Sequence, residues 1–339
     1  MTLQNNVIYK TAYNIVRKNK TLNHLAHRVI QSEAVNSFSP YIFIYKKLIQ
    51  QKAVEYLKIP STIEFEITNK CNARCIMCPP AVHMGQDFLD TDLFKKISKD
   101  AFSMGVRKMC LTGGEPLLDK QIFEKIKWAK KYGYDYIHLF SNGSLMGKSN
   151  QQKLLKSGID SLTISVDSAV KEEYEAIRKN LNYDTVISNI KSLFFLKQKF
   201  KFQKPIIRIN MVAQPANIKS RKIFIDMFKT FADIVEIIDD HNFAGLRDDT
   251  GRHKEYSQKT RFPCQILFCK IVVDTHGYLK KCGIDYTDSS ILADLKRKNL
   301  KEALYKSRAL EIKKKHLLYD FSEQGCVSCT QKESWWVDE

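Results

Sequence analysis

Three cysteines stand close together in one short segment. Cys71, Cys75 and Cys78 are separated by three and by two residues. Soft thiolate ligands at this spacing can surround one metal centre, and iron–sulfur clusters are held through cysteine sulfur. Zinc prefers four ligands in a closed tetrahedron, and His83 is the nearest residue that could complete one. The spacing indicates a metal centre, with a cluster that leaves one iron open as the first interpretation and structural zinc as the second.

A short strand comes directly before this cysteine loop. Between Thr62 and Thr68 the apolar residues Ile63, Phe65 and Ile67 alternate with polar ones. A period of two is typical of a strand whose two faces meet different surroundings. We therefore expect the cysteines to follow the C-terminal end of a strand.

A cysteine loop of this spacing after a first strand resembles the radical S-adenosylmethionine (radical SAM) enzymes. The resemblance implies a [4Fe-4S] cluster on the three cysteines and S-adenosylmethionine bound at its open iron. In that family an aromatic residue usually precedes the third cysteine and lies near the adenine. This chain has Met77 there, and a polarizable methionine can also pack on a base.

The second strand leads into a Gly-Gly-Glu-Pro segment. Gly113 and Gly114 could let a ligand approach the backbone closely, and Glu115 could accept a hydrogen bond from an ammonium group. On its own this segment is a turn at least as often as a site. One βα unit after the cysteine loop, it resembles the radical SAM element that holds the methionyl amine.

Further polar residues follow the next strands. Ser141 and Asn142 end the third strand, and Ser165 and Asp167 end the fourth. In isolation, turn formation explains Asn-Gly equally well. The resemblance implies that these four residues line the S-adenosylmethionine. It also implies that Arg178 reaches the methionyl carboxylate, although an exposed position on a helix is the alternative.

The fifth strand places Arg208 and Asn210 on one face by alternation. If that face is the interior of a barrel, both side chains need polar partners, which a substrate or cofactor could supply. Some relatives carry a glycine-rich adenine-binding element after this strand, where this chain has residues 214–217 (Gln-Pro-Ala-Asn). By strand-end placement, the candidates for the catalytic base are Arg208, Asp239 and His241.

A second group of cysteines occupies the C-terminal quarter of the chain. Its members are Cys264, Cys269, Cys282, Cys326 and Cys329. Residues 271–279 read as a β-hairpin that presents Cys282. A zinc ribbon, in which four cysteines close a tetrahedron, is the structural alternative.

The arrangement resembles the C-terminal SPASM module of radical SAM enzymes, or its shorter twitch form. The resemblance implies one auxiliary [4Fe-4S] cluster, with Cys264, Cys282, Cys326 and Cys329 as its ligands. Cys269 is a spare that could replace Cys264. Cys110, inside a strand, is expected to be a small buried apolar residue.

Short apolar strands alternate with longer helical stretches through the central part of the chain. We predict strands at residues 62–68, 106–111, 136–140, 162–166, 206–212 and 234–238. We predict helices at residues 93–102, 122–131, 151–156, 170–199 and 219–230. This alternation predicts an α/β fold, a partial (β/α)6 TIM-like barrel, with its chemistry at the C-terminal ends of the strands.

Four regions are expected along the chain. Residues 1–60 form a basic helical N-terminal extension, and residues 61–240 form the radical SAM partial barrel. Residues 241–260 form a polar linker, and residues 261–339 form the small α+β SPASM/twitch cluster domain.

Composition narrows the setting of the protein. The odd count of nine cysteines, with close spacings and no export signal, fits metal ligands in a reducing compartment better than disulfides. No apolar stretch is long enough for a membrane span. We therefore predict a cytoplasmic protein. The net charge of +18 comes from lysines scattered along the whole chain and is read as a solvated surface.

The resemblance implies a mechanism. Reductive cleavage of S-adenosylmethionine gives a 5′-deoxyadenosyl radical, which abstracts a hydrogen atom from the substrate. The auxiliary cluster then takes an electron from the substrate radical, so the net reaction is an oxidation. Relatives with a single auxiliary cluster favour a sugar- or cyclitol-like alcohol as the substrate.

Two alternatives remain at this point, a ribosomal-peptide maturase of the SPASM type and a non-enzymatic, zinc- or cluster-stabilised binding protein. Besides a small-molecule or peptide substrate, the expected partner is a reductase such as flavodoxin or ferredoxin. We do not expect a nucleic-acid partner, because no motif combining aromatic and basic residues is visible.

Overall fold

The computed structural model describes residues 53, 54, 57, 59–79, 84–247, 261–306 and 308–330. The expected N-terminal extension lies almost entirely outside these residues. His83 and residues 248–260 of the expected linker lie outside them as well.

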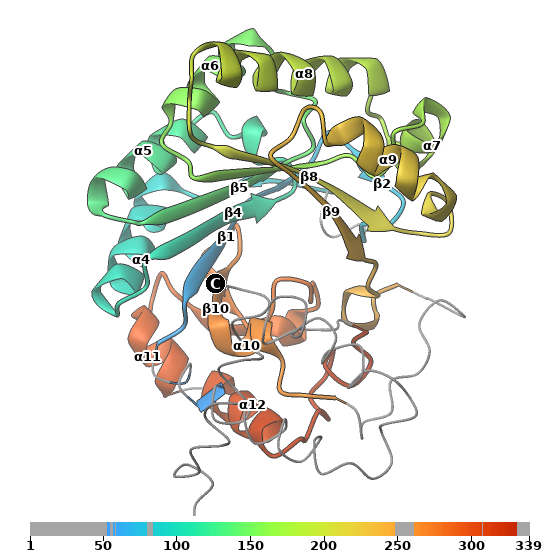
Figure 1. Cartoon of the computed structure of the whole chain (residues 1–339). Helices are drawn as coiled ribbons and strands as arrows, with labels where there is room; N and C mark the ends of the chain where they lie inside the picture. The colour runs from blue at the N-terminus through green and yellow to red at the C-terminus, as the bar shows by residue number, and fades with distance from the viewer. Residues whose placement is uncertain are drawn as a thin grey trace, which may run out of the picture.

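A sheet of parallel strands forms the centre of the molecule (Figure 1). The six expected strands are all present: β1 (Thr62–Lys70), β4 (Lys108–Gly113), β5 (Tyr136–Ser141), β6 (Ser161–Ser165), β8 (Ile206–Ala213) and β9 (Ile234–Asp239). They lie side by side in that order, each parallel to the next. The sheet is open, with β9 at one end of the strand order, so the predicted α/β partial-barrel fold is confirmed.

Helices cover one side of this sheet (Figure 1). They are α4 (Thr91–Ser103), α5 (Ile122–Tyr132), α6 (Lys148–Lys156), α7 (Lys171–Ile177), α8 (Tyr183–Lys199) and α9 (Arg221–Phe228). Short 3-10 turns follow two of the strands, η4 (Pro116–Leu118) after β4 and η5 (Ile218–Ser220) after β8. Asp90 caps α4 by accepting hydrogen bonds from the backbone N–H groups of Asp92 and Leu93.

The helix expected over residues 170–199 is wrong, because it is two helices. Arg178 leaves the helical conformation and begins β7 (Arg178–Lys179), which pairs antiparallel with β2 (Arg74–Cys75). The side chain of Asn182 then caps α8 by accepting from the backbone N–H of Thr185. The pairing of β7 with β2 therefore connects the cysteine loop to the segment that follows β6.

The two faces of the sheet differ in polarity. Toward the helices, Ile63, Phe65 and Ile67 of β1 are fully buried, and the rings of Phe65 and Phe94 lie 4.7 Å apart between centroids. On the opposite face of the sheet, which we call the inner face, β1 presents Glu64 and Glu66. Burial of the apolar face supplies the hydrophobic stabilisation of this layer.

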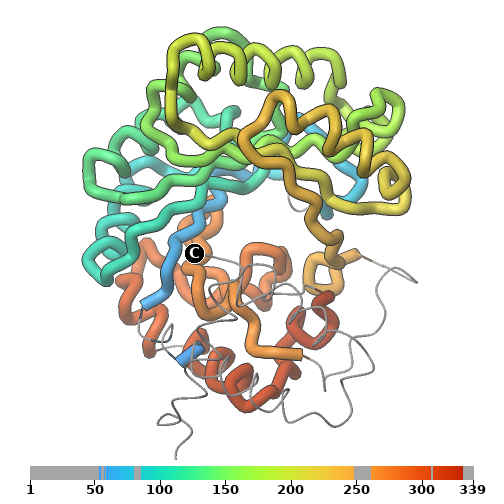
Figure 2. The backbone as a smooth tube through the Cα atoms, viewed as in Figure 1, coloured from blue at the N-terminus to red at the C-terminus, as the bar shows by residue number. Residues whose placement is uncertain are grey.

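The C-terminal part of the chain extends the same sheet (Figure 2). Its strands are β10 (Lys270–Val273), β11 (Tyr278–Lys280) and β12 (Ile291–Asp294). The predicted hairpin is confirmed, since β10 and β11 pair antiparallel, and β10 also pairs parallel with β1. A further short strand, β3 (Met84–Phe88), pairs antiparallel with the C-terminal end of β1.

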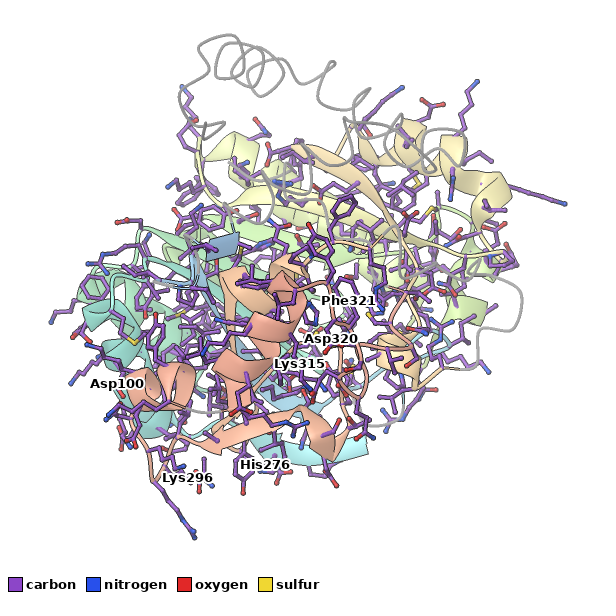
Figure 3. All side chains as sticks on the ribbon, turned by 90° about the horizontal axis from the view of Figure 1, so that it is seen from below. Asp100, His276, Lys296, Lys315, Asp320 and Phe321 are labelled. Carbon is purple, nitrogen blue, oxygen red and sulfur yellow. The ribbon has the colours of Figure 1, made fainter. Side chains whose placement is uncertain are left out.

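Small helices complete the C-terminal part. They are η6 (Phe243–Gly245), α10 (Gln265–Cys269), η8 (Asp288–Ser290), α11 (Leu300–Tyr305) and α12 (Arg308–Leu317). Figure 3 shows Asp320 and Phe321 just beyond the end of α12 and His276 at the turn between β10 and β11. The guanidinium of Arg261 lies 4.6 Å from the ring centroid of Phe321, which packs this region together. Within the described ranges, no helix combines the length and apolar character that crossing a membrane requires.

Replacement of Phe65 by alanine should destabilise the protein strongly. Its ring is fully buried, and truncating a buried phenylalanine lowers the free energy of unfolding by about 3–5 kcal/mol. The matched control is Phe195→Ala, because the Phe195 side chain is 62% exposed and its loss should change stability by less than about 0.5 kcal/mol. Urea unfolding followed by circular dichroism measures both, and equal losses would contradict the assigned core.

Candidate active site

The end of β4 lies unusually close to the end of β1. A Cβ atom on Gly113 would stand 2.4 Å from the Thr68 carbonyl oxygen, and one on Gly114 would stand 2.1 Å from the Lys70 carbonyl oxygen. The backbone N–H of Gly114 donates to Thr68 O at 2.6 Å, and the N–H of Glu115 donates to Lys70 O at 2.9 Å. The two glycines are therefore required by the approach of another backbone. This contact fixes the residue from which the cysteine loop starts.

Glu115 joins the ends of β4 and β5. Its Oε1 accepts from the Ser141 hydroxyl at 2.9 Å and from the Leu117 N–H at 3.1 Å, and its Oε2 accepts from the Asn142 N–H at 2.7 Å. Burial raises the pKa of this carboxyl, and these hydrogen bonds oppose that shift. A carboxylate has about four acceptor positions, so one position on Oε2 is left for an ammonium group.

Asn142 connects β5 to the cysteine loop. Its Nδ2 donates to Asn72 Oδ1 at 2.8 Å, and its Oδ1 accepts from the N–H of Ser144 at 3.0 Å. Asn72 in turn donates to the Ser144 hydroxyl at 2.8 Å. The sequence interpretation missed Asn72, although its place between Cys71 and Cys75 in the loop was the available signal.

Arg178 lies against the cysteine loop rather than on an exposed helix face. The side chain is buried, and its Nε donates to Asp167 Oδ2 at 2.7 Å. Its Nη1 lies 3.7 Å from the sulfur of Cys75. The other oxygen of Asp167 accepts from the Val212 N–H at 2.7 Å, so the whole carboxylate is engaged inside the protein. The structure thus brings both predicted residues together beside the three thiols.

The three thiols of the loop influence one another. A hydrogen bond with Cys78 lowers the pKa of Cys75 to about 7, despite burial, and the charge of Arg178 contributes. Burial raises the pKa of Cys71, whose sulfur accepts from the Ala73 N–H at 3.4 Å. The hydrogen bond with Cys75, together with burial, raises the pKa of Cys78. The contacts of the loop therefore favour the thiolate, which is the form that binds iron, at Cys75.

Buried polar atoms without partners lie at the end of β8. Among the described residues, Asn210 Oδ1 and both side-chain polar atoms of Gln214 are buried and make no hydrogen bond. Asn210 stands opposite Ser165 in the sheet. Such groups are costly unless a ligand pairs with them. They fit a bound nucleoside-like group at the place where the sequence departs from the glycine-rich adenine element. Met77, by contrast, is buried within the apolar core.

The second cysteine group also comes together. Burial raises the pKa of the Cys282 thiol to about 12, and the nearby Cys329 and Cys326 add to that shift. The sulfur of Cys282 accepts from the Ile284 N–H at 3.5 Å, as Cys71 does from Ala73. The Cys329 N–H donates to Cys326 O at 3.2 Å, which repeats the turn between Cys75 and Cys78. Both C-x-x-C segments therefore adopt the same local turn.

Two further cysteines of the C-terminal part have different surroundings. The N–H of Cys264 donates to His316 Nδ1 at 3.3 Å. Cys269 is buried in a small apolar cluster with Leu267, Phe268 and Ile312. Across the described residues, no three His, Cys, Asp or Glu side chains meet as the ligands of a single ion would. Cluster ligands do not have to meet in that way, because each thiolate binds a different iron.

Part of the expected linker is attached to the second cysteine loop. Asn242 Nδ2 donates to Ser328 O at 2.6 Å, and the Asn242 N–H donates to the Thr330 hydroxyl at 2.9 Å. The hydroxyl of Ser328 donates to Ala244 O at 3.1 Å. Residues 241–247 therefore carry the chain from β9 directly to the second cysteine group.

The three candidates for the catalytic base lie in different places. Arg208 is on the inner face and pairs with Glu236 at 2.6 Å. His241 Nδ1 accepts from the Phe243 N–H at 3.2 Å, and the two rings lie 4.2 Å apart between centroids. Asp239 is exposed, and by alternation it lies on the helix side of β9. The structure therefore does not bring Asp239 to the inner face.

Comparison with known proteins follows this geometry. Residues 65–199 match the model of the Radical SAM superfamily. A protein named "Probable GTP 3',8-cyclase" from Methanocaldococcus jannaschii is 28% identical over 190 residues, which are 56% of this chain and 60% of that protein. GTP 3',8-cyclase of Staphylococcus carnosus is 29% identical over 162 residues, 45% of each chain. The chain thus matches only about half the length of these relatives.

Two solved structures resemble most of this chain in fold although their sequence identity to it is low. SuiB of Streptococcus suis bound to the precursor peptide SuiA has a TM-score of 0.63 at 13% identity, covering 94% of this chain and 84% of that one. BtrN in complex with AdoMet and 2-DOIA has a TM-score of 0.55 at 15% identity, covering 81% and 94%. These likenesses concern the fold, and with the family match they confirm the radical SAM resemblance.

Replacement of Gly114 by alanine should impair the first cysteine group. The new Cβ would lie 2.1 Å from a backbone oxygen, so the start of the cysteine loop must shift. We expect a loss of about half the iron bound after anaerobic reconstitution, corresponding to one of two clusters. Gly147→Ala is the matched control, because no atom lies within 4 Å of its added Cβ. Full iron content in the Gly114 variant would contradict the assigned contact.

Proposed function

With a radical SAM domain over residues 65–199, the chain is a radical SAM enzyme, and on that premise we propose that it oxidises a sugar- or cyclitol-like alcohol. The product would be the corresponding ketone. The proposal is carried by the second cysteine group, which supplies a place for the electron that the oxidation releases.

The cofactors of this enzyme class are a [4Fe-4S] cluster and S-adenosylmethionine. Together they supply a carbon radical that removes a hydrogen atom from the substrate. Cys71, Cys75 and Cys78 would hold the cluster. Arg178 would hold positive charge beside it, and the remaining acceptor position of Glu115 would bind the methionyl ammonium group.

The polar groups at the strand ends would orient the rest of the cofactor. We assign the nucleoside side to Ser165, Asn210 and Gln214, because two of these residues have buried atoms in need of a partner. Ser141, Asn142 and Asp167 use their side chains within the protein, so their part is to position the loop and Arg178. Gly113 and Gly114 would also act indirectly, because they let β4 approach the end of β1 from which the cysteine loop starts.

An alcohol becomes a ketone by losing one hydrogen atom, one proton and one electron. The hydrogen atom would go to the carbon radical, and the proton would go to a base, for which His241 remains a candidate. Arg208 is paired with Glu236, and a guanidinium has no acceptor for a proton, so it is set aside as the base. Cys282, Cys326 and Cys329, with Cys264 as the proposed fourth ligand, would hold an auxiliary cluster, and that cluster would supply the acceptor for the electron. A reductase such as flavodoxin or ferredoxin would return the first cluster to its active state.

Two other substrates follow from the similar proteins. The matched stretches cover 60% and 45% of the two GTP 3',8-cyclases, so they support the radical chemistry more than the choice of GTP. A peptide is the second candidate, because β9 ends the strand order of the sheet and such an edge can accept an extended chain.

Separate cysteine variants should divide the reaction into two parts. Cys75→Ala should abolish deoxyadenosine formation. Cys282→Ala should keep that activity, lose about half the iron and fail to form oxidised product, because the electron has no acceptor. Cys110→Ala is the control, since that thiol is buried in β4 and belongs to neither cysteine group. Normal product formation by the Cys282 variant would refute the auxiliary role.

Deuterium transfer should identify the substrate class. We expect deuterium from the carbinol carbon of a labelled cyclitol or sugar to appear in deoxyadenosine, as measured by mass spectrometry. The same assay with GTP and with labelled peptides tests the two alternatives. Transfer from either of those, and from no alcohol, would replace the proposed substrate.

A further inference from the structure

The inner face of the sheet is only partly covered by protein. Thr112, His138 and Arg208 retain exposure there, whereas apolar residues on the helix side, such as Met109, Ile137 and Ile207, are buried. The strand register aligns Glu66 with Thr112 and Thr163 with Arg208. His138 Nε2 lies 2.8 Å from the Thr163 hydroxyl. A row of polar groups therefore crosses the sheet on the side that faces the C-terminal elements.

A buried ion pair joins this row to the C-terminal hairpin. Lys280 of β11 and Glu66 of β1 are 2.7 Å apart, and their side chains are 5% and 8% exposed. The same Lys280 Nζ lies 4.1 Å from the centroid of the Tyr286 ring. A cation over an aromatic face is attracted to it, so the pair fixes the position of the ring.

Tyr286 comes four residues after Cys282 and lies against Lys280. Burial raises the pKa of its phenol well above the usual range, and the charges of Glu66, Cys78 and Cys282 add to that shift. The phenol is therefore within electrostatic range of one thiol from each group, Cys78 and Cys282. The ring of Phe243 is 6.3 Å away between centroids. Tyr286 is partly exposed, and in the part of the chain that is described no hydrogen bond engages its hydroxyl, which leaves that group accessible to a ligand.

We propose that Tyr286 binds the substrate, its phenol O–H donating to a hydroxyl or amino group of a polyhydroxylated small molecule on the inner face. Glu66 and Lys280 are positioning residues that hold the ring. This inference rests on the proposed function and narrows its substrate to a compact polar molecule on the inner face. A site that hydrogen-bonds a substrate hydroxyl rejects analogues that lack it.

Calorimetric titration of the anaerobically reconstituted full chain tests the proposal without turnover. The clusters are kept oxidised, S-adenosylmethionine is present, and the titrants are myo-inositol, glucose and cyclohexanol. We expect at least one of the two polyols to bind more tightly than cyclohexanol. Tyr286→Phe removes only the hydroxyl and should weaken that binding about fivefold to tenfold. Tyr132→Phe makes the same change on an exposed ring of α5 and should have no effect.

A second variant tests the positioning residues. The double change Lys280→Met and Glu66→Gln removes both charges together and should weaken polyol binding about two- to threefold while the iron content is kept. Equal polyol binding by the wild type and Tyr286→Phe, or no polyol binding by the wild type, would overturn the inference. Failure of the proposed function shows separately, as product formation by the Cys282→Ala variant.

Discussion

The approach of β4 to β1 determines where the candidate site can form. Two carbonyl oxygens of β1 occupy the space that side chains would need at Gly113 and Gly114. The hydrogen bonds made there fix Lys70, which directly precedes Cys71, and place Glu115 beside the end of β5. Because parallel strands end at one edge of a sheet, this single contact aligns the cysteine loop with the polar strand ends.

Polar groups around the loop are paired almost completely by the protein itself. Glu115 holds Ser141 and Asn142, and Asp167 holds Arg178. A buried charge is tolerated when partners satisfy it, and such pairing also restricts its geometry. Arg178 is therefore already in place beside Cys75 before any cofactor arrives. The unpaired atoms of Gln214 stand out against this background, which is why we assign them to a ligand.

Much of this arrangement could be predicted from the sequence. Alternation in residues 62–68 identified both the strand and its apolar face, and cysteine spacing predicted that each of the two cysteine groups holds a cluster. The sequence could not show that Gly114 faces a backbone rather than a ligand, because both situations require a missing side chain. The helix over residues 170–199 was overextended, since its apolar periodicity continues while β7 pairs with β2. Tyr286 carries no local motif, and only the ion pair between distant strands makes it notable.

The pairing of β10 with β1 has a consequence for the size of the substrate. Neighbouring strands are about 4.8 Å apart, so β11 lies about 10 Å from β1 across the sheet. The first cysteine group follows β1, and Cys282 comes two residues after β11. Hydrogen bonds between strands hold this separation, and the Glu66–Lys280 pair spans it directly. β11 runs antiparallel to β10, so Cys282 lies level with the start of β1, whereas Cys71 follows the end of β1. A molecule the size of one sugar ring therefore reaches Tyr286, which lies over Lys280 beside the middle of β1, rather than both cysteine groups.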